Sequence, residues 1–463
     1  MGVDTVHPEY EKMLDEWKLV AACASGSREV KKLGTKILPA PGEKDGVYDK
    51  NRYKAYLKRA IYTNVTGRTQ QGLTGAAFRL PPEIDLPAGL EYLEDNADGS
   101  GQSIEQLSKD VFSSLLKSGR EVLLTEYPEV EQGLTAEDIE ILNPQATIKR
   151  YCATDLTNWR LETIAGQSVL TLAVLQETYN DSIDEFQHDE KIQYRVLRLD
   201  RTGYSQQVYR DGNPINQQVY PTKSDGTTFD RMPVFIVGAQ NNDASVDEVP
   251  LSDIAYVNVG HFRNSADLEE NSFVHGQMTL GITTNLDSDT WKQMNPNGIV
   301  VGSMAGHYLG ENGGFHTAQA SENQIADKLQ ERKEGQMLAL GAKLVEQRNP
   351  NETAAAAKID ATGENSVLSD LVTNVEEGIQ RAIEFCGMFM GVDVDGSEAF
   401  MMNRQFFDDS IDPQMLMAAI QGYDRGVIAK SDLQNDYRKA GLVDQDRTNE
   451  DIDNETGQAS PLE

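Results

Sequence analysis

One loop carries the residues whose types and spacing best match a chemical site. Calcium in EF-hand loops prefers carboxylate and amide oxygens, and such residues, with one glycine, fall here at positions 1, 3, 5, 6 and 12 of that pattern: Glu94, Asn96, Asp98, Gly99 and Glu105. The pattern normally begins with Asp, however, and Gly101 stands where a hydrophobic residue is expected. A polar turn before a helix explains the same residues, because a carboxylate in the first turn favours the helix dipole. We therefore expect no metal, and Glu94, Asn96, Asp98 and Glu105 are the alternative calcium ligands.

Motifs for other common chemistries are missing from the sequence. The dipeptide Gly-Lys never occurs, so there is no phosphate-binding P-loop, and the HExxH, GxSxG and GxGxxG patterns are absent. Cys23, Cys152 and Cys386 are far apart and form no CxxC pair, which predicts buried thiols rather than a disulfide framework or zinc site. His307 and His316 share a glycine-rich segment with no third ligand. The sequence gives no positive case for an enzyme, and we expect no cofactor.

The charge of the chain limits the kinds of partner that it can hold. With 74 acidic and 42 basic residues its formal charge is −32, whereas a protein that grips DNA needs local positive charge to displace counterions from phosphates. This argues against a repressor or nuclease, but allows either a conduit that does not adhere to DNA or a protein that never meets it. No run approaches the roughly 20 apolar residues of a membrane span, and the N-terminus does not resemble a signal peptide. We expect about three soluble folding units, made in the cytosol.

Helices are expected first along the chain, and strands after them. One helical stretch lies within residues 8–38, and a second begins near Tyr53 and lies before Gly67. A capping box of Ser103 and Gln106 opens a third helix, which Gly119 ends. Short strand-like runs follow at 121–127 and from about 151 to 237. In the first helix, the three- and four-residue spacing puts one set of residues on a single face: Met13, Leu14, Trp17, Val20 and Ala21.

The second half is expected to be mostly helical. One helix covers 250–275, a second covers 321–346, and a third reaches 390 after the break QRNPNET at 347–353. A segment rich in Gly, Asn and Thr lies between the first two. Shorter helices and an acidic tail follow. The expected stripes are Leu251, Ala255, Val259, Phe262, Ala266 and Phe273 in the first helix, and Val367, Leu371, Val375, Ile379, Ala382, Cys386 and Phe389 in the third.

Several segments, in order along the chain, resemble one family. The longest is RYKAYLKRAIYTNVTGRTQQGLTGAAFRLPP (52–82), followed by DGSGQSIEQL, SGREVLLTEYP and YCATDLTNWRLE. The helical segment GYDRGVIAKSDLQNDYRKAGLV (422–443) completes the series. Together they resemble the portal proteins of tailed bacteriophages, over most of the chain from Arg52 to Val443. The order and spacing of the segments, rather than any single motif, carry the resemblance.

The resemblance implies a mixed α+β portal-type fold with an α/β wing, a two-helix stem, a clip, a long tunnel helix and a helical crown. On this assignment the wing comprises residues 1–249. The two stem helices are 250–275 and 321–346, and the clip between them is 276–320. The tunnel loop and tunnel helix take 347–390, and the crown with its acidic tail takes 391–463. A plain turn between helices is the alternative interpretation of the tunnel loop. Its implied channel-facing residues are Gln347, Arg348, Asn349, Pro350 and Asn351.

The resemblance also implies a function and its partners. Portal subunits form a homo-oligomeric ring, usually a dodecamer, at one capsid vertex of the virion, and double-stranded DNA passes through it without sequence specificity. The implied partners are a terminase, a major capsid or scaffold protein and a tail adaptor, with no membrane. Two rivals stay open: another head–tail structural adaptor, although adaptors are generally shorter, and a calcium-dependent hydrolase that uses the loop at 94–105.

Overall fold

The computed structural model shows a mixed α/β chain that divides into two units, Met1–Asn403 and Arg404–Glu463. Within its described ranges, each helix is too short or too polar to span a membrane. The described residues are 2–128, 142–276, 279–296, 298–299, 307–318, 324–340, 354–394, 399–404, 406, 420–421, 423, 425, 429–439, 443, 447–449 and 452.

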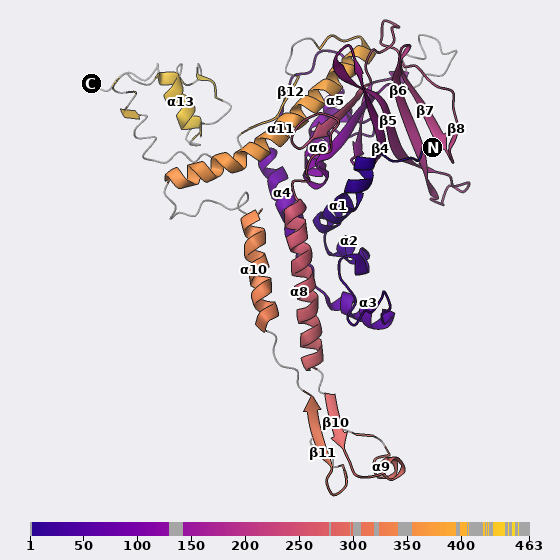
Figure 1. Cartoon of the computed structure of the whole chain (residues 1–463). Helices are drawn as coiled ribbons and strands as arrows, with labels where there is room; N and C mark the ends of the chain where they lie inside the picture. Colours follow the sequence, from indigo (N-terminus) through magenta and orange to yellow (C-terminus); the bar gives the residue numbers. More distant parts are fainter. Residues whose placement is uncertain are drawn as a thin grey trace. The chain divides into compact units, whose positions relative to one another are not determined.

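Short helices make up the N-terminal part of the first unit and pack against one another and against the long helix α8 (Figure 1). The helix predicted from its capping box is confirmed as α6. There, Ser103 Oγ accepts the Gln106 N–H at 3.1 Å, and Gly119 ends the helix with φ 67°. The elements are α1 (Pro8–Ser25), α2 (Ser27–Lys32), the 3₁₀ turn η1 (Gly34–Lys36), α3 (Lys50–Arg59), α4 (Val65–Ala77), α5 (Leu93–Asn96) and α6 (Ile104–Ser118).

Two antiparallel sheets follow these helices in the chain and contact each other through polar side chains. Tyr151 of the first sheet donates to the Glu177 carboxylate of the second at 2.7 Å, and Arg195 of the second lies 3.3 Å from the Glu126 carboxylate of the first. The first sheet has the order β3-β2-β9, with β2 (Arg120–Glu126), β3 (Thr147–Cys152) and β9 (Val234–Gly238). The second has the order β4-β5-β6-β7-β8, with β4 (Leu156–Ile164), β5 (Gln167–Asn180), β6 (Glu190–Asp200), β7 (Gly203–Arg210) and β8 (Asn213–Pro214).

The second half supplies long helices, as the periodicity predicted. α11 lies on the first sheet and on α6, so β2 is buried between these helices and the second sheet. The strands β1 (Glu83–Ile84) and β12 (Phe400–Met401) pair with each other, and β12 contacts α11. The second unit contains α13 (Lys430–Lys439). The remaining elements are α8 (Ser252–Gly276), β10 (Thr279–Thr283), α9 (Ser288–Met294), β11 (Gly314–Ala318), α10 (Gln324–Leu340) and α11 (Ala354–Met390).

Three details of the expected helices are wrong. On α1, Trp17 and Val20 are buried as expected, but Met13 and Leu14 are only half-buried and Ala21 is exposed. Phe273 is 42% exposed near the end of α8. Gly67 does not follow the helical region; it lies inside a further helix, α4, near its first turn.

Residue 67 of α4 is a glycine because the backbones of α1 and α4 approach closely there. A Cβ atom at this position would lie 2.3 Å from the Ala24 carbonyl oxygen of α1. The side chain of Asn64, which caps α4 by accepting the Gly67 N–H at 2.8 Å, also reaches Ala24 and donates to its carbonyl at 3.1 Å. Glycine therefore lets α1 and α4 touch, despite its cost in helix propensity.

We expect Gly67→Ala to destabilise the first unit by about 1 to 3 kcal/mol, because the added methyl group has to displace the backbone of α1. Gly75 is the matched control in the same helix, since a Cβ atom there meets nothing within 4 Å. Gly75→Ala should stabilise the chain by about 1 kcal/mol through helix propensity alone. Urea unfolding followed by circular dichroism checks both values. Equal effects of the two substitutions would contradict the close approach.

Candidate functional site: the paired helices and their hairpin

Two helices joined through a hairpin form the candidate site. α8 and α10 run side by side in opposite directions, and β10 and β11 lie between them along the chain (Figure 1). At the helix contact, Lys333 Nζ donates to the Gly260 carbonyl oxygen at 2.8 Å, and His261 Nε2 lies 3.1 Å from Glu334 Oε1. Burial and then the nearby Arg263 lower the pKa of Lys333. The pair is thus fixed by polar contacts as well as by buried Met337.

A buried asparagine attaches α8 to the chain that leads into α4. Asn258 is fully buried, and its Oδ1 accepts from Tyr62 Oη at 2.7 Å and from Thr66 Oγ1 at 3.0 Å. Its Nδ2 donates to the Thr63 carbonyl oxygen at 2.9 Å. Because every polar atom of the amide has a partner, the network specifies one position of α8 against the N-terminal helices.

The middle of α8 is held by α3. Tyr56 Oη donates to Asp267 Oδ1 at 2.7 Å, and Arg59 forms an ion pair with Glu270. Burial and then Asp267 raise the pKa of Tyr56. The guanidinium of Arg59 also lies 4.0 Å over the ring of Phe273. This cation–π contact explains how an apolar residue expected in the core can stay partly exposed.

We call β10, α9, β11 and the described residues between them the hairpin unit; it is part of the first of the two compact units. Leu280 pairs with Thr317 and Ile282 with Phe315 across the two strands. Asn295 is buried and donates to the carbonyl oxygens of Trp291 and Tyr308, both at 3.3 Å, which ties α9 to the segment before β11. Three large apolar side chains of the unit stay exposed: Met294, Tyr308 and Phe315.

The histidines of this segment have separate partners. His316 Nε2 lies 3.1 Å from Thr283 Oγ1, and His307 Nδ1 lies 3.3 Å from Asn295 Oδ1. In the part of the chain that the structure describes, no group of three or more His, Cys, Asp or Glu side chains is arranged to hold a metal ion.

The long helix α11 is fixed closely to the first sheet. Asn374 Nδ2 donates to the Gly238 carbonyl oxygen at 2.9 Å, and Thr125 Oγ1 of β2 donates to the Ala382 carbonyl oxygen at 3.2 Å. At Gly378 a Cβ atom would lie 2.5 Å from Val237 Cγ2, so glycine allows the close contact. The predicted stripe from Leu371 to Phe389 is buried, while the side chain of Val367 lies outside the described residues. The expected channel-facing residues, Gln347, Arg348, Asn349, Pro350 and Asn351, also lie outside them.

In the loop that was the alternative calcium site, the side-chain oxygens of Asp98 and Asn96 accept hydrogen bonds from backbone N–H groups of the same loop. Asp98 Oδ1 accepts the Ser100 N–H at 2.7 Å and the Gln102 N–H at 3.0 Å, and Asn96 Oδ1 accepts the Gly101 N–H at 2.7 Å. Burial opposes the shift, but hydrogen bonds from Ser100 and Gln102 lower the pKa of Asp98. Glu94 and Glu105 are exposed. The local geometry is that of a polar turn that leads into α6.

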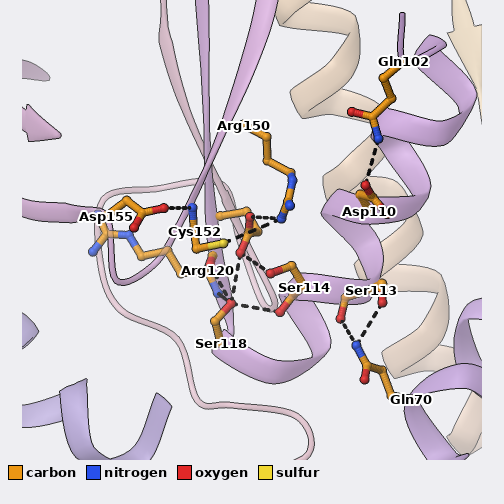
Figure 2. A network of polar contacts seen from close by, with 11 residues as sticks. Gln70, Gln102, Asp110, Ser113, Ser114, Ser118, Arg120, Arg150, Cys152 and Asp155 are labelled. Carbon is orange, nitrogen blue, oxygen red and sulfur yellow. Dashed lines mark hydrogen bonds and ion pairs between the residues drawn. The ribbon is translucent and has the colours of Figure 1, made fainter. Parts of the chain in front are cut away.

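A buried carboxylate network, which the sequence did not reveal, lies between α6 and the first sheet. Glu121 Oε1 accepts from Ser114 Oγ at 2.6 Å, and Arg150 Nη1 lies 3.2 Å from Glu121 Oε2; Figure 2 shows Ser114, Ser118 and Arg150 converging there. Cys152 Sγ lies 3.7 Å from the same Arg150 nitrogen. Burial raises the pKa of Glu121 to about 7, against the opposing effects of Arg150 and Ser114.

Such a carboxylate beside a thiol and hydroxyl groups has the composition of an acid–base site. The Glu121 side chain is fully buried, however, so a substrate cannot reach it. The network is structural: it neutralises a charge in the layer between α6 and β2. Strand alternation places Glu121 on the same face as Leu123 and Thr125, but both faces of β2 are buried, so the pattern did not single out the carboxylate.

Comparison with known proteins finds a family over the same part of the chain. A family model described as "domain of unknown function (DUF4055)" matches residues 250–390, the span from α8 to the end of α11. No curated protein matches the chain.

The solved structures that match the chain come from particles of a phage-like gene transfer agent (GTA). The neck of an empty GTA particle, computed with C6 symmetry, is 12% identical, covers 82% of this chain and 90% of that chain, and has a TM-score of 0.40. The virion of a native particle is 13% identical, with 90% and 96% covered and a TM-score of 0.39. A native neck with C12 symmetry is 11% identical, with 90% and 100% covered and a TM-score of 0.40. Scores of this size do not establish a common fold.

Proposed function

We propose that this chain is the portal subunit of a tailed bacteriophage. It forms a ring at one vertex of the capsid, and double-stranded DNA passes through the ring during packaging and ejection. The order of elements in residues 252–390 carries the proposal: a helix, a hairpin unit, an antiparallel return helix, and a 37-residue helix fixed on the core sheet. The resemblance of segments along the chain implies the same order for stem, clip, stem and tunnel helix.

The parts of the chain have distinct roles in this proposal. The wing is 1–249, and α8 and α10 are the stem. The hairpin unit in 276–320 is the clip, where a terminase and later a tail adaptor dock. Residues 347–351 face DNA before the tunnel helix. The crown begins at 391, and its 16 acidic against 6 basic residues repel packaged DNA. The subunit shapes a channel and catalyses no reaction.

Apolar side chains on α10 support contact between copies. Ile325 is 72% exposed and Leu329 is 41% exposed, and they lie one helical turn apart on the same face. A neighbouring stem in a ring would bury both side chains, which a single chain leaves in water.

We expect the purified chain to form a closed ring, usually a dodecamer, with a central hole. Native mass spectrometry gives the subunit number, and negative-stain images of the same sample show the hole. Because scaffold or capsid protein can be required for assembly, the chain is also co-expressed with the capsid protein of its own particle. A compact dimer with calcium-dependent turnover under both conditions would instead establish the hydrolase alternative.

Paired variants on α10 locate the contact. Ile325→Glu with Leu329→Glu should prevent ring formation, because both carboxylates would be buried against the neighbouring copy. Lys328→Glu with Asp327→Lys is the control, since both residues are exposed in the same turn and the net charge is unchanged. Rings formed equally well by both variants would remove α10 from the interface.

A further inference from the structure

Positive charge gathers in one N-terminal segment of this acidic chain. Residues 27–68 contain 11 Lys and Arg against 4 Asp and Glu, a formal charge of +7, so the other residues carry −39. The net charge of the chain therefore conceals an uneven distribution of basic and acidic residues. We call the exposed basic side chains of α2, η1, α3 and the loop between them the basic surface: Arg28, Lys32, Lys36, Lys44, Lys50, Arg52, Lys54 and Lys58.

Three of the four acidic residues of this segment have local partners, and one of them, Glu43, accepts the Ala40 N–H at 3.3 Å. Glu29 lies 2.7 Å from Lys32 Nζ and 3.7 Å from Arg28. Asp49 caps α3 by accepting the N–H groups of Asn51 and Arg52, at 2.9 and 3.1 Å. Among the described residues, Lys36, Lys44, Lys50, Lys54 and Lys58 have no ion pair within 4.0 Å. Most of the positive charge on the basic surface is therefore uncompensated.

The surface is preorganised on a rigid base. Lys31 Nζ donates to the Lys58 carbonyl oxygen at 3.3 Å, which joins α2 to the end of α3. Tyr53 Oη donates to the Leu38 carbonyl oxygen at 3.2 Å, and Tyr56 fixes α3 to α8 through Asp267. Lys50, Lys54 and Lys58 recur every fourth residue, so they form one row along the outer face of α3.

We propose that the basic surface binds the phosphate backbone of duplex DNA without reading its sequence. Flexible lysines suit phosphates as point charges, and releasing the counterions of DNA drives such binding. Protein interfaces, in contrast, are depleted in Lys and enriched in Arg and aromatic side chains. The basic surface has mainly Lys, and its one large exposed apolar residue is Val47. A single chain carries the whole surface, so this contact is separate from passage through a channel and does not depend on ring formation.

The experiment measures the affinity of the full chain for a short, fluorescently labelled duplex of mixed sequence by anisotropy. Salt is varied between about 50 and 200 mM, where counterion release has a large effect. The test variant is Lys50→Glu with Lys54→Glu and Lys58→Glu, and Gln at the same positions neutralises the row without reversing it. The control is Lys18→Glu with Lys292→Glu and Lys328→Glu, three exposed lysines elsewhere whose change in net charge is the same.

We expect the Glu variant to bind at least about tenfold more weakly at low salt, and its salt slope to fall by about 0.9 for each phosphate that the row no longer neutralises. The Gln variant should show a smaller loss of affinity, and the control a change below about threefold because of screening. Equal losses in test and control variants would overturn the proposal, since net charge alone would then explain binding. If the wild type binds no duplex but the Glu variant self-associates less in sedimentation, the surface contacts the acidic surface of a second copy, and the DNA proposal is wrong. Ring formation by the same samples tests the portal proposal separately.

Discussion

Arg150→Met is expected to destabilise the first unit by about 3 to 5 kcal/mol at pH 8, because it leaves the Glu121 carboxylate buried without its counter-charge. The structure makes this loss hard to relieve. Glu121 is fully buried, and in the described residues only Ser114, Ser118 and Arg150 contact its oxygens. Hydroxyl groups can satisfy the hydrogen bonds of a carboxylate, but they cannot neutralise its charge. Urea unfolding followed by tryptophan fluorescence measures the loss.

The pH dependence of this variant has a definite sign. Burial raises the pKa of Glu121 to about 7, from an unfolded value of 4.5. The folded chain therefore binds the proton more tightly than the unfolded chain. The stability that this group contributes is full below pH 4.5 and is lost as the pH rises through 7. Because Glu121 is protonated at low pH, Arg150→Met should cost less at pH 5 than at pH 8.

A double variant provides the control. Glu121→Gln removes the buried charge and keeps an acceptor for Ser114, so adding it to Arg150→Met should restore part of the lost stability. A cycle of the two single variants and the double variant then isolates their coupling. A cost for Arg150→Met that is the same at pH 5 and pH 8, with no recovery in the double variant, would mean that Arg150 acts only by packing.

Local signals in the sequence predicted local structure well. Ser103 and Gly119 define both ends of α6 because each acts on backbone groups within four residues of itself. The mixed α/β class, the strands near 121–127 and 167–210, and the helices of the second half also followed from apolar periodicity. These features depend on neighbours in the chain, which a single sequence contains.

The errors have long-range causes. Gly67 looked like a breaker because its reason for being glycine, the carbonyl of Ala24, lies 43 positions earlier and in another helix. Phe273 fits the stripe of α8, but it is partly exposed near the end of that helix, where the guanidinium of Arg59 from α3 lies over its ring. No periodicity can show where a partner helix ends.

The site was predicted unevenly for the same reason. Residues 121–127 were predicted as a strand, but β2 is buried on both faces, so alternation could not single out Glu121, and its partner Arg150 comes from another strand. The net charge of −32 also concealed the basic surface, because summing over 463 residues removes the position of each charge. A sliding count of charge would have revealed the segment at 27–68.

The second large effect is expected at the base of α8, where Asn258→Leu should cost about 3 to 5 kcal/mol. The substitution leaves the hydroxyl and the backbone N–H of Thr66 buried without their partner, and each such group costs about 1 to 3 kcal/mol. Tyr62 also loses its hydrogen bond to Asn258, although it still reaches the Cys23 carbonyl oxygen at 2.9 Å. The stability of the first unit in urea measures the effect.

A control and a coupled variant distinguish this network from simple packing. Asn271→Leu makes the same change on the same helix where the side chain is only half-buried, and should alter stability by about 0.5 kcal/mol or less. Tyr62→Phe removes one donor to Asn258, so its cost and that of Asn258→Leu should not add in the double variant. Full additivity would mean that the two side chains stabilise the fold independently. With the expected coupling, α8 would be held in one position by a polar network rather than by apolar contact alone. A helix that projects toward the hairpin needs such a fixed base, since apolar contacts along its length permit several registers.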